Sequence, residues 1–291
     1  MKRLHYLSLT TAFAQVIDAR GELLAIATSF FYETSNSELF LITNWHNVTG
    51  RSASRPWNSR TGAVPCSLTI KLHRKQKQSA EKPSAISIRD VAEVSVPINS
   101  ENGDEPLWLE HPDHKYYVDA VGIRITDPLE FREKYEFNVA NRWREYHADY
   151  EPEAMDDVFV VGFPWGLSSS RSGGGGLPIY KRGCIASDPV VDFNQLPCVL
   201  IDCRTTSAMS GSPVIASRSG MFHPDGGMSP NSVIGTVSRF LGVYSARRYE
   251  AESALGPREE ASEIGVVWKA SALEAIVERG ESGTPLTELA R

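Results

Sequence analysis

The chain has 291 residues, of which 41% are hydrophobic, 23% charged and 9% aromatic. This composition is typical of a globular protein with a sizeable core, which excludes fibrous and disordered classes. Its 30 Lys and Arg against 36 Asp and Glu give a formal net charge of −6, without the basic excess of a nucleic-acid-binding protein. No segment approaches the roughly 18 consecutive apolar residues of a membrane-spanning helix. We therefore expect neither a nucleic-acid nor a membrane partner.

The four cysteines, Cys66, Cys184, Cys198 and Cys203, do not form a CxxC pair. A secreted protein of this size would have enough of them for two disulfides. The N-terminus, however, lacks the apolar core and cleavage site of a signal peptide. We therefore expect reduced thiols and a cytoplasmic location.

Short apolar segments separated by turns fill the first part of the chain. Residues 12–33 predict a hairpin with its turn at residues 20–22. Further strands are predicted at residues 38–45, 67–74, 85–98 and 117–125. The charged stretch 127–155 is richer in helix-forming residues and predicts a partly helical connector.

A second series of strands follows this connector. They are predicted at residues 157–164, 177–187, 198–204, 212–218, 232–240 and 264–271. Residues 271–280 then have apolar side chains at helical spacing and end in Gly280, which predicts a short helix. Two groups of short strands predict an all-β protein with two small antiparallel barrels or sandwiches.

The segment TTSAMSGSPV at residues 205–214 carries the most specific motif. A serine in a tight Gly/Pro turn between two strands exposes its Oγ, while nearby amide groups point outward and can stabilise an oxyanion. An ordinary polar turn would have the same composition. The functional interpretation of Ser210 therefore depends on a base and an orienting acid elsewhere in the chain.

Candidates for both groups lie earlier in the sequence. His46 directly follows an apolar strand, and Asp119 lies at the start of another. Alone, each would more often be structural, the histidine as an exposed strand end and the aspartate as a turn cap. Such an acid would fix the tautomer of the imidazole and stabilise the imidazolium that forms when His46 takes the Ser210 proton. The order His46, Asp119, Ser210 on paired β units is a much stronger signal than any one of them.

These segments resemble the chymotrypsin-like (trypsin-like) serine peptidase family, in particular its bacterial branch. The resemblance is carried by TNWHNV (43–48), VDAVGIRI (118–125), VGFPWG (161–166), MSGSPV (209–214) and IGTVS (234–238). It implies two antiparallel six-stranded β-barrels, a short C-terminal helix and an active site between the barrels. The expected division is an N-terminal barrel at 1–126, a connector at 127–156, a C-terminal barrel at 157–270 and a helix with tail at 271–291.

The resemblance also implies the chemistry. His46 would be the general base, Asp119 its orienting acid and Ser210 the nucleophile, with the amides of Ala208 and Ser210 forming the oxyanion hole. The chain would then be an endopeptidase that cleaves protein or peptide substrates through an acyl-enzyme and needs no metal or cofactor.

The chain departs from the family at two positions beside the nucleophile. The family usually has glycine where this chain has Ala208, and Met209 cannot form the ion pair by which digestive members are activated. If residue 208 needs a positive φ, alanine resists it by about 1–2 kcal/mol. Two alternatives therefore stay open, a catalytically silent binding module and an effector that a partner activates.

Four further residues are candidates for substrate contacts. Arg204 lies six residues before Ser210, near the expected base of the primary pocket, where it would favour acidic side chains; a solvated arginine is the commoner alternative. Thr205 follows it in the TT segment, which resembles that of bacterial glutamyl endopeptidases. Ser238 and Arg239 are expected to form one wall of the cleft and to pair with an extended substrate.

Other motifs predict no chemistry. His111 and His114 flank a proline and an aspartate and lack a third metal ligand, which favours a loop. The glycine-rich stretch at 168–176 lacks the Lys-Ser/Thr end of a phosphate-binding loop. The basic run at 71–78 and the acidic stretch at 253–263 are interpreted as solvated surface.

Overall fold

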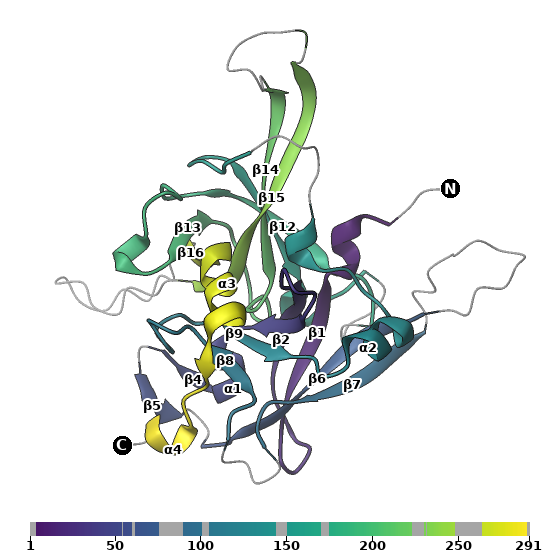
Figure 1. The fold of residues 1–291 in the computed structure, drawn as a ribbon, viewed down its shortest axis with the longest axis vertical. Helices are drawn as coiled ribbons and strands as arrows, with labels where there is room; N and C mark the ends of the chain where they lie inside the picture. Colours follow the sequence, from purple (N-terminus) through teal and green to yellow (C-terminus); the bar gives the residue numbers. More distant parts are fainter. Residues whose placement is uncertain are drawn as a thin grey trace, which may run out of the picture.

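The computed structural model describes residues 4–53, 55–59, 62–75, 90–100, 105–143, 150–169, 175–222, 230, 232–247 and 264–289. Most of its strands form two antiparallel β units that pack against each other, with one helix against both (Figure 1). The short strands β4 (Arg51–Ser52) and β5 (Arg55–Ser59) pair separately as a two-stranded sheet. The predicted all-β fold is confirmed, and the arrangement is consistent with the chymotrypsin-like double barrel. The division into four sequence ranges stays a prediction.

The first unit is a nine-stranded sheet. Its strands are β1 (Thr11–Asp18), β2 (Leu23–Glu33), β3 (Leu39–Thr43), β6 (Pro65–Arg74), β7 (Val91–Pro97), β8 (Trp108–Glu110), β9 (Val121–Arg124), β10 (Tyr135–Glu136) and β17 (Glu281–Ser282). The predicted hairpin at 12–33 is β1 and β2, with Gly21 of its turn at φ 80°. The sheet exceeds the six strands expected partly because β10 and β17, from later parts of the chain, pair with β6 and β8.

The second unit is a closed barrel of six strands, as predicted. They are β11 (Asp157–Gly162), β12 (Ile179–Ile185), β13 (Cys198–Asp202), β14 (Pro213–Phe222), β15 (Val233–Arg247) and β16 (Ile264–Lys269). Strands β14 and β15 are longer than predicted, and they project from the barrel as a hairpin arm (Figure 1). The length of β15 decides which of its residues reach the site described below.

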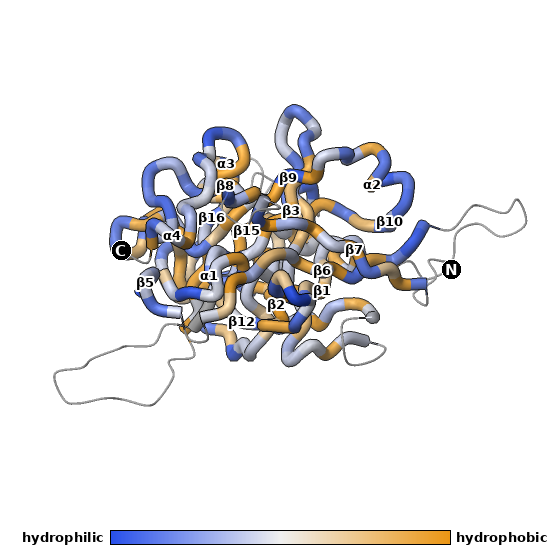
Figure 2. Tube along the Cα trace, turned by 90° about the horizontal axis from the view of Figure 1, so that it is seen from below, coloured by the Kyte–Doolittle hydropathy of each residue, from blue (hydrophilic) through white to orange (hydrophobic). Residues whose placement is uncertain are grey.

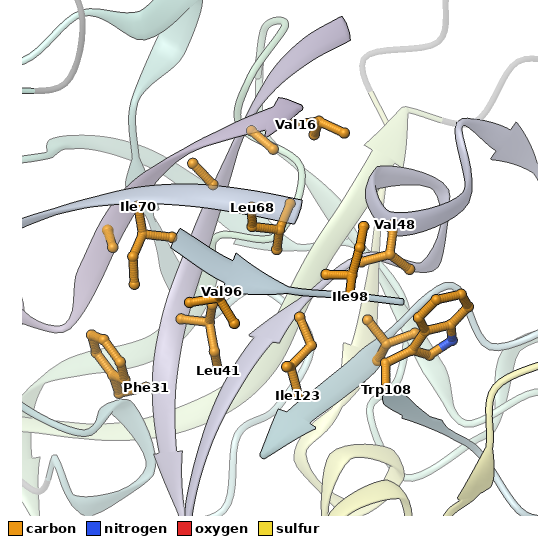
Figure 3. Packing of buried hydrophobic residues seen from close by; sticks show 14 of the residues in the cluster. Val16, Phe31, Leu41, Val48, Leu68, Ile70, Val96, Ile98, Trp108 and Ile123 are labelled. Atoms are coloured by element: carbon orange, nitrogen blue, oxygen red, sulfur yellow. The ribbon is translucent and has the colours of Figure 1, made fainter. Parts of the chain in front are cut away.

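Buried hydrophobic side chains fill the interior of each unit and the space between the two units. Hydrophobic stretches follow the strands through the centre of the molecule, and many hydrophilic stretches lie in peripheral loops (Figure 2). Inside the first sheet, Leu41, Leu68, Ile70 and Ile123 pack together (Figure 3). Complete burial of one such side chain contributes about 1.5–3 kcal/mol. This packing fixes the ends of β3 and β9, from which the polar site begins.

Helix α3 (Ala270–Arg279) confirms the predicted C-terminal helix. Its buried residues Leu273, Ile276 and Val277 share one face, as helical spacing requires, and join the core cluster that includes Phe40 of the first unit and Phe240 of the second. The other α-helices of the described residues are α1 (Trp45–Thr49), α2 (Pro128–Lys134) and α4 (Leu286–Leu289). The two β units therefore share one hydrophobic interface.

Within the described ranges, no helix is long and apolar enough to cross a membrane. No disulfide joins the four cysteines.

Candidate active site

His46 lies on α1, a helix of five residues that begins two residues after β3. All five residues of β3 are buried, so the chain leaves the core at a fixed point. Trp45 and Val48 of α1 pack back into the core, and Gly50, at φ 67°, ends the helix. His46 keeps 30% of its side chain exposed, so its ring is held in place and remains reachable.

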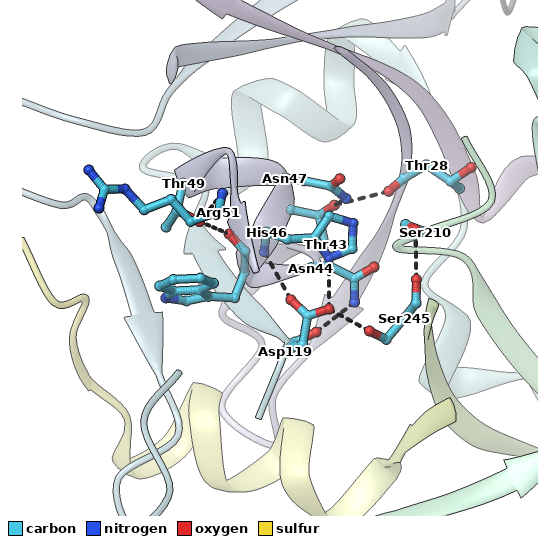
Figure 4. A network of polar contacts seen from close by, with 11 residues as sticks. Thr28, Thr43, Asn44, His46, Asn47, Thr49, Arg51, Asp119, Ser210 and Ser245 are labelled. Carbon is cyan, nitrogen blue, oxygen red and sulfur yellow. Dashed lines mark hydrogen bonds and ion pairs between the residues drawn. The ribbon is translucent and has the colours of Figure 1, made fainter. Parts of the chain in front are cut away.

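Asp119 holds both the ring and the backbone of His46. Its Oδ2 lies 2.7 Å from Nδ1 of the imidazole, and its Oδ1 accepts the main-chain N–H of His46 at 2.9 Å (Figure 4). Asn44 donates its side-chain amide to the carbonyl of Asp119 at 2.6 Å. With Nδ1–H donated to the carboxylate, Nε2 of His46 is the nitrogen left to accept a proton.

The two groups shift each other's pKa. Burial lowers the pKa of His46, but the charge of Asp119 and its hydrogen bond outweigh burial, so the pKa lies above its ordinary value. Burial raises the pKa of Asp119, but the charge of His46 and the hydrogen bonds from His46 and Ser245 outweigh it, so that pKa is lowered. The pair therefore favours an ionised carboxylate beside a more basic imidazole.

Ser210 lies beside the ring of His46, at the tip of the turn that precedes β14 (Figure 4). Its hydroxyl donates to the main-chain carbonyl of Ser245 at 2.6 Å. The hydroxyl of Ser245 in turn donates to Oδ2 of Asp119. The structure thus brings His46, Asp119 and Ser210 together, with Ser245 as a bridge between the acid and the serine.

Ser245 could not be recognised in the sequence. It lies 126 residues from Asp119, near the end of β15, and no local motif marks it. Only the pairing of β15 with β14 and β16 brings it to the site.

Three carbonyl groups of the nucleophile turn are held by donors from elsewhere in the chain. The main-chain N–H of Trp165 donates to the carbonyl of Ser207 at 2.9 Å. Thr28 donates twice, through its hydroxyl to the carbonyl of Ala208 at 2.8 Å and through its main-chain N–H to the carbonyl of Ser210 at 2.9 Å. Peptide units are planar and trans, so a carbonyl held on one side directs the following N–H to the other.

Two amide groups of the turn are left available. Among the hydrogen bonds between described residues, none uses the N–H of Ala208 or of Ser210 as a donor. Ala208 has φ 70°, the left-handed region that costs a residue with a Cβ about 1–2 kcal/mol. Residue 208 therefore does take a positive φ, and alanine adopts it.

Two glycines are required by the close packing of this turn. Gly211 has φ 86°, and a Cβ on it would lie 2.0 Å from the carbonyl oxygen of Thr28. A Cβ on Gly162 would lie 2.1 Å from the hydroxyl of Ser212 and 2.8 Å from that of Thr28. The turn thus sits directly against β2 of the first unit and β11 of the second.

Of the predicted substrate contacts, Arg204 and Thr205 lie in the segment between β13 and the nucleophile turn. Arg204 is exposed, and Thr205 is buried with its hydroxyl against that of Tyr244. Their contact with substrate stays a prediction.

Ser238 and Arg239 are not brought to the site. The Trp143 indole donates to the Ser238 hydroxyl at 2.9 Å, and Arg239 pairs with Glu151. Because β15 continues to Arg247, Ser238 lies seven residues before Ser245, roughly 20 Å along an extended strand. The prediction that Ser238 and Arg239 form a wall of the cleft is therefore corrected. The end of β15 around Ser245 lies beside Ser210 instead.

His111 and His114, the histidines considered as metal ligands, lie in a hydrogen-bonded loop. Nδ1 of His111 accepts the main-chain N–H groups of Asp113 and His114, which fits the predicted loop. In the described parts of the chain, no group of three or more His, Cys, Asp or Glu side chains is placed to hold a metal ion.

No family model matches the chain, and no curated protein matches its sequence. Among solved structures, it is similar to the active form of the Rv3671c protease from M. tuberculosis, with a TM-score of 0.43, 15% identity, and coverage of 96% of this chain and 84% of that chain. It is also similar to human heparin binding protein, with a TM-score of 0.45, 11% identity, and coverage of 95% and 93%. These likenesses are distant, so the chemistry of the site rests on this chain's own residues.

Proposed function

We propose that the chain is a serine endopeptidase that hydrolyses peptide bonds of protein or peptide substrates through an acyl-enzyme. The observation that carries the proposal is the position of Ser210 beside an imidazole whose Nδ1 lies 2.7 Å from the buried carboxylate of Asp119. A base with a raised pKa, a hydroxyl within its reach and free amide groups next to that hydroxyl are the parts that acyl transfer needs.

In this reaction, Oγ of Ser210 attacks the carbonyl carbon of the scissile bond and Nε2 of His46 takes its proton. The amides of Ala208 and Ser210 bind the oxyanion, and Asp119 stabilises the imidazolium. His46 then returns the proton to the leaving amine, and water repeats the sequence on the acyl-enzyme. Before attack, the Ser210 hydroxyl must exchange its hydrogen bond to the Ser245 carbonyl for one to Nε2 of His46.

A second candidate is a binding module of the same fold that does no chemistry or waits for an activating partner. The observation in its favour is the Ser210 hydroxyl itself, which donates to the Ser245 carbonyl at 2.6 Å. Against a silent module stands the left-handed Ala208, because the turn accepts this strain while leaving the amide of Ala208 available.

Labelling with a fluorophosphonate probe separates the two candidates. We expect stoichiometric modification of the purified wild-type protein, none of Ser210→Ala, and wild-type labelling of Ser219→Ala, whose exposed hydroxyl contacts only Thr236 among the bonds described. A peptide library digested by the wild type and by Ser210→Ala then tests cleavage and side-chain preference at Arg204. Absence of labelling in the folded wild type would support the second candidate.

A further inference from the structure

Thr28 carries a hydroxyl from the first β unit into the nucleophile turn of the second. The residue is fully buried on β2, 180 residues away in sequence from Ala208. Its Oγ1 donates to the carbonyl of Ala208 at 2.8 Å and accepts the main-chain N–H of Phe163 at 3.3 Å. One hydroxyl thus connects the turn to two other segments.

The carbonyl that Thr28 holds belongs to the strained residue of the turn. Ala208 has φ 70°, and unlike a glycine it has a Cβ that opposes this conformation. Such a backbone state persists only when surrounding contacts determine it. The peptides on both sides of Ala208 are held. Trp165 holds the preceding one at the Ser207 carbonyl, and the following one is held by the hydroxyl of Thr28 at its carbonyl and by the Thr206 carbonyl, which accepts the Met209 N–H at 3.2 Å.

We propose that Thr28 is a positioning residue whose hydroxyl keeps Ala208 left-handed and so keeps the amide of Ala208 available to bind the oxyanion. This inference rests on the proposed peptidase function. Without the hydroxyl, only the Met209 N–H on the carbonyl of Thr206 still holds the peptide after Ala208, and the Cβ of alanine drives φ back to negative values. The Ala208 N–H then no longer points to the side opposite the Ser207 carbonyl that Trp165 holds.

The same residue ties the turn to the helix that carries His46. The carbonyl of Thr28 accepts the hydroxyl of Thr43 at 3.0 Å, and the Thr43 hydroxyl accepts the side-chain amide of Asn47 at 3.0 Å (Figure 4). Asn47 is the neighbour of His46 on α1. The base and the oxyanion site therefore share one buried chain of hydrogen bonds that passes through Thr28.

The test compares Thr28→Val with Thr28→Ser. Valine keeps the shape and the main-chain N–H but loses the hydroxyl, whereas serine keeps the hydroxyl. The readout is the second-order rate of fluorophosphonate labelling, in which Oγ of Ser210 attacks phosphorus, fluoride leaves, His46 takes the serine proton and the phosphoryl oxygen occupies the oxyanion site. We expect Thr28→Val to lower this rate about 10-fold or more, towards the roughly 10²–10³-fold loss seen when an oxyanion donor is removed, and Thr28→Ser to restore it. Equal rates for both variants would overturn the inference.

A second-site change separates positioning from general stability. Glycine adopts positive φ readily, so in an Ala208→Gly background the Thr28→Val substitution should lower the labelling rate far less than in the native background. Additive effects of the two substitutions contradict the inference. If Thr28→Val alone does not fold, recovery of the folded state in the double variant supports it, and failure to recover contradicts it.

Crystal structures of the wild type and Thr28→Val distinguish failure of this inference from failure of the proposed function. A wild type that is folded but never labelled overturns the peptidase proposal, whatever Thr28 does. In that case, a negative φ at residue 208 in Thr28→Val still supports the positioning role. A positive φ with the Ser207 carbonyl still on Trp165 overturns it.

Discussion

The two halves of the candidate site are held by different forces. On the first β unit, His46 and Asp119 are joined by charge, by a side-chain hydrogen bond and by a main-chain N–H that the carboxylate accepts. On the second, the turn around Ser210 is held by captured carbonyl groups, a left-handed alanine and a glycine with no room for a Cβ. The first half should therefore respond to charge and pH, and the second to small changes in backbone freedom.

The strongest test of the charged half is Asp119→Asn. The amide keeps the shape but cannot hold Nδ1–H of His46 as an ionised acceptor, so the imidazole loses its tautomer and the stabilisation of its cation. We expect a loss of about 10⁴ in turnover or labelling rate, the size known for this substitution in serine peptidases. Circular dichroism must show an intact fold, and near-wild-type rates would remove Asp119 from the mechanism.

The corresponding test of the backbone half is Gly211→Ala. Its Cβ would lie 2.0 Å from the carbonyl oxygen of Thr28 and 2.7 Å from the hydroxyl of Thr43, so the turn must move. We expect a loss of about 3 kcal/mol or more in the free energy of unfolding, together with loss of labelling.

Gly21→Ala is the matched control for this substitution. Gly21 has a similar φ of 80°, but a Cβ on it would meet no atom within 4 Å, so only the conformational cost of about 1–2 kcal/mol applies. Equal destabilisation by the two substitutions in urea unfolding would show that contact with Thr28 is not what confines the turn.

The pH dependence sharpens the comparison further. Attack needs a neutral His46, and its pKa is raised above 6.5, so the labelling rate should rise with pH through a value above 6.5. The contribution of His46 to stability has the opposite sign: it is complete below pH 6.5 and is lost as pH rises through the folded-state pKa. Asp119, with its lowered pKa, stabilises above its ordinary value of 3.8 and loses this as pH falls through the folded value.

Labelling rates between about pH 5 and 9 check this prediction, with His73→Gln as the control. The pKa of His73 is lowered by burial, and its substitution should leave the inflection where it is. An inflection below pH 6.5 in the wild type contradicts a raised pKa of His46.

The smallest expected effect is on stability, through Glu110, which links Trp45 beside His46 to the C-terminal segment at Thr284. The buried Glu110 accepts the indole N–H of Trp45 at 2.8 Å and that of Trp108 at 3.4 Å, and Thr284 donates to it twice at 2.9 Å. Glu110→Gln weakens these charge-assisted bonds and should cost about 1–3 kcal/mol of unfolding free energy. Glu93→Gln is the control. The carboxylate of Glu93 is exposed and pairs with Lys71, so its loss should cost at most about 1 kcal/mol of unfolding free energy.

Local sequence was sufficient for the elements on which the site is built. Alternating and continuous apolar segments predicted the hairpin of β1 and β2, most strands of the barrel and α3, because their side-chain periodicity depends only on neighbouring residues. His46, Asp119 and Ser210 were found because each lies at the end of a recognisable strand or in a recognisable turn.

Contacts between distant segments decided the rest. Ser238 and Arg239 were expected at the cleft, but β15 is long enough to place Ser245 there instead. The pairing of β15 with β14 determines where this strand ends, and local sequence does not show it. Thr28 and Ser245 have no local signal, since the hydroxyl of each acts on a residue more than 100 positions away, Ala208 and Asp119 respectively. The sequence thus determined which groups can do the chemistry, whereas the packing of two β units decided which groups hold them, because hydrogen bonds across that interface exist only after the chain has folded.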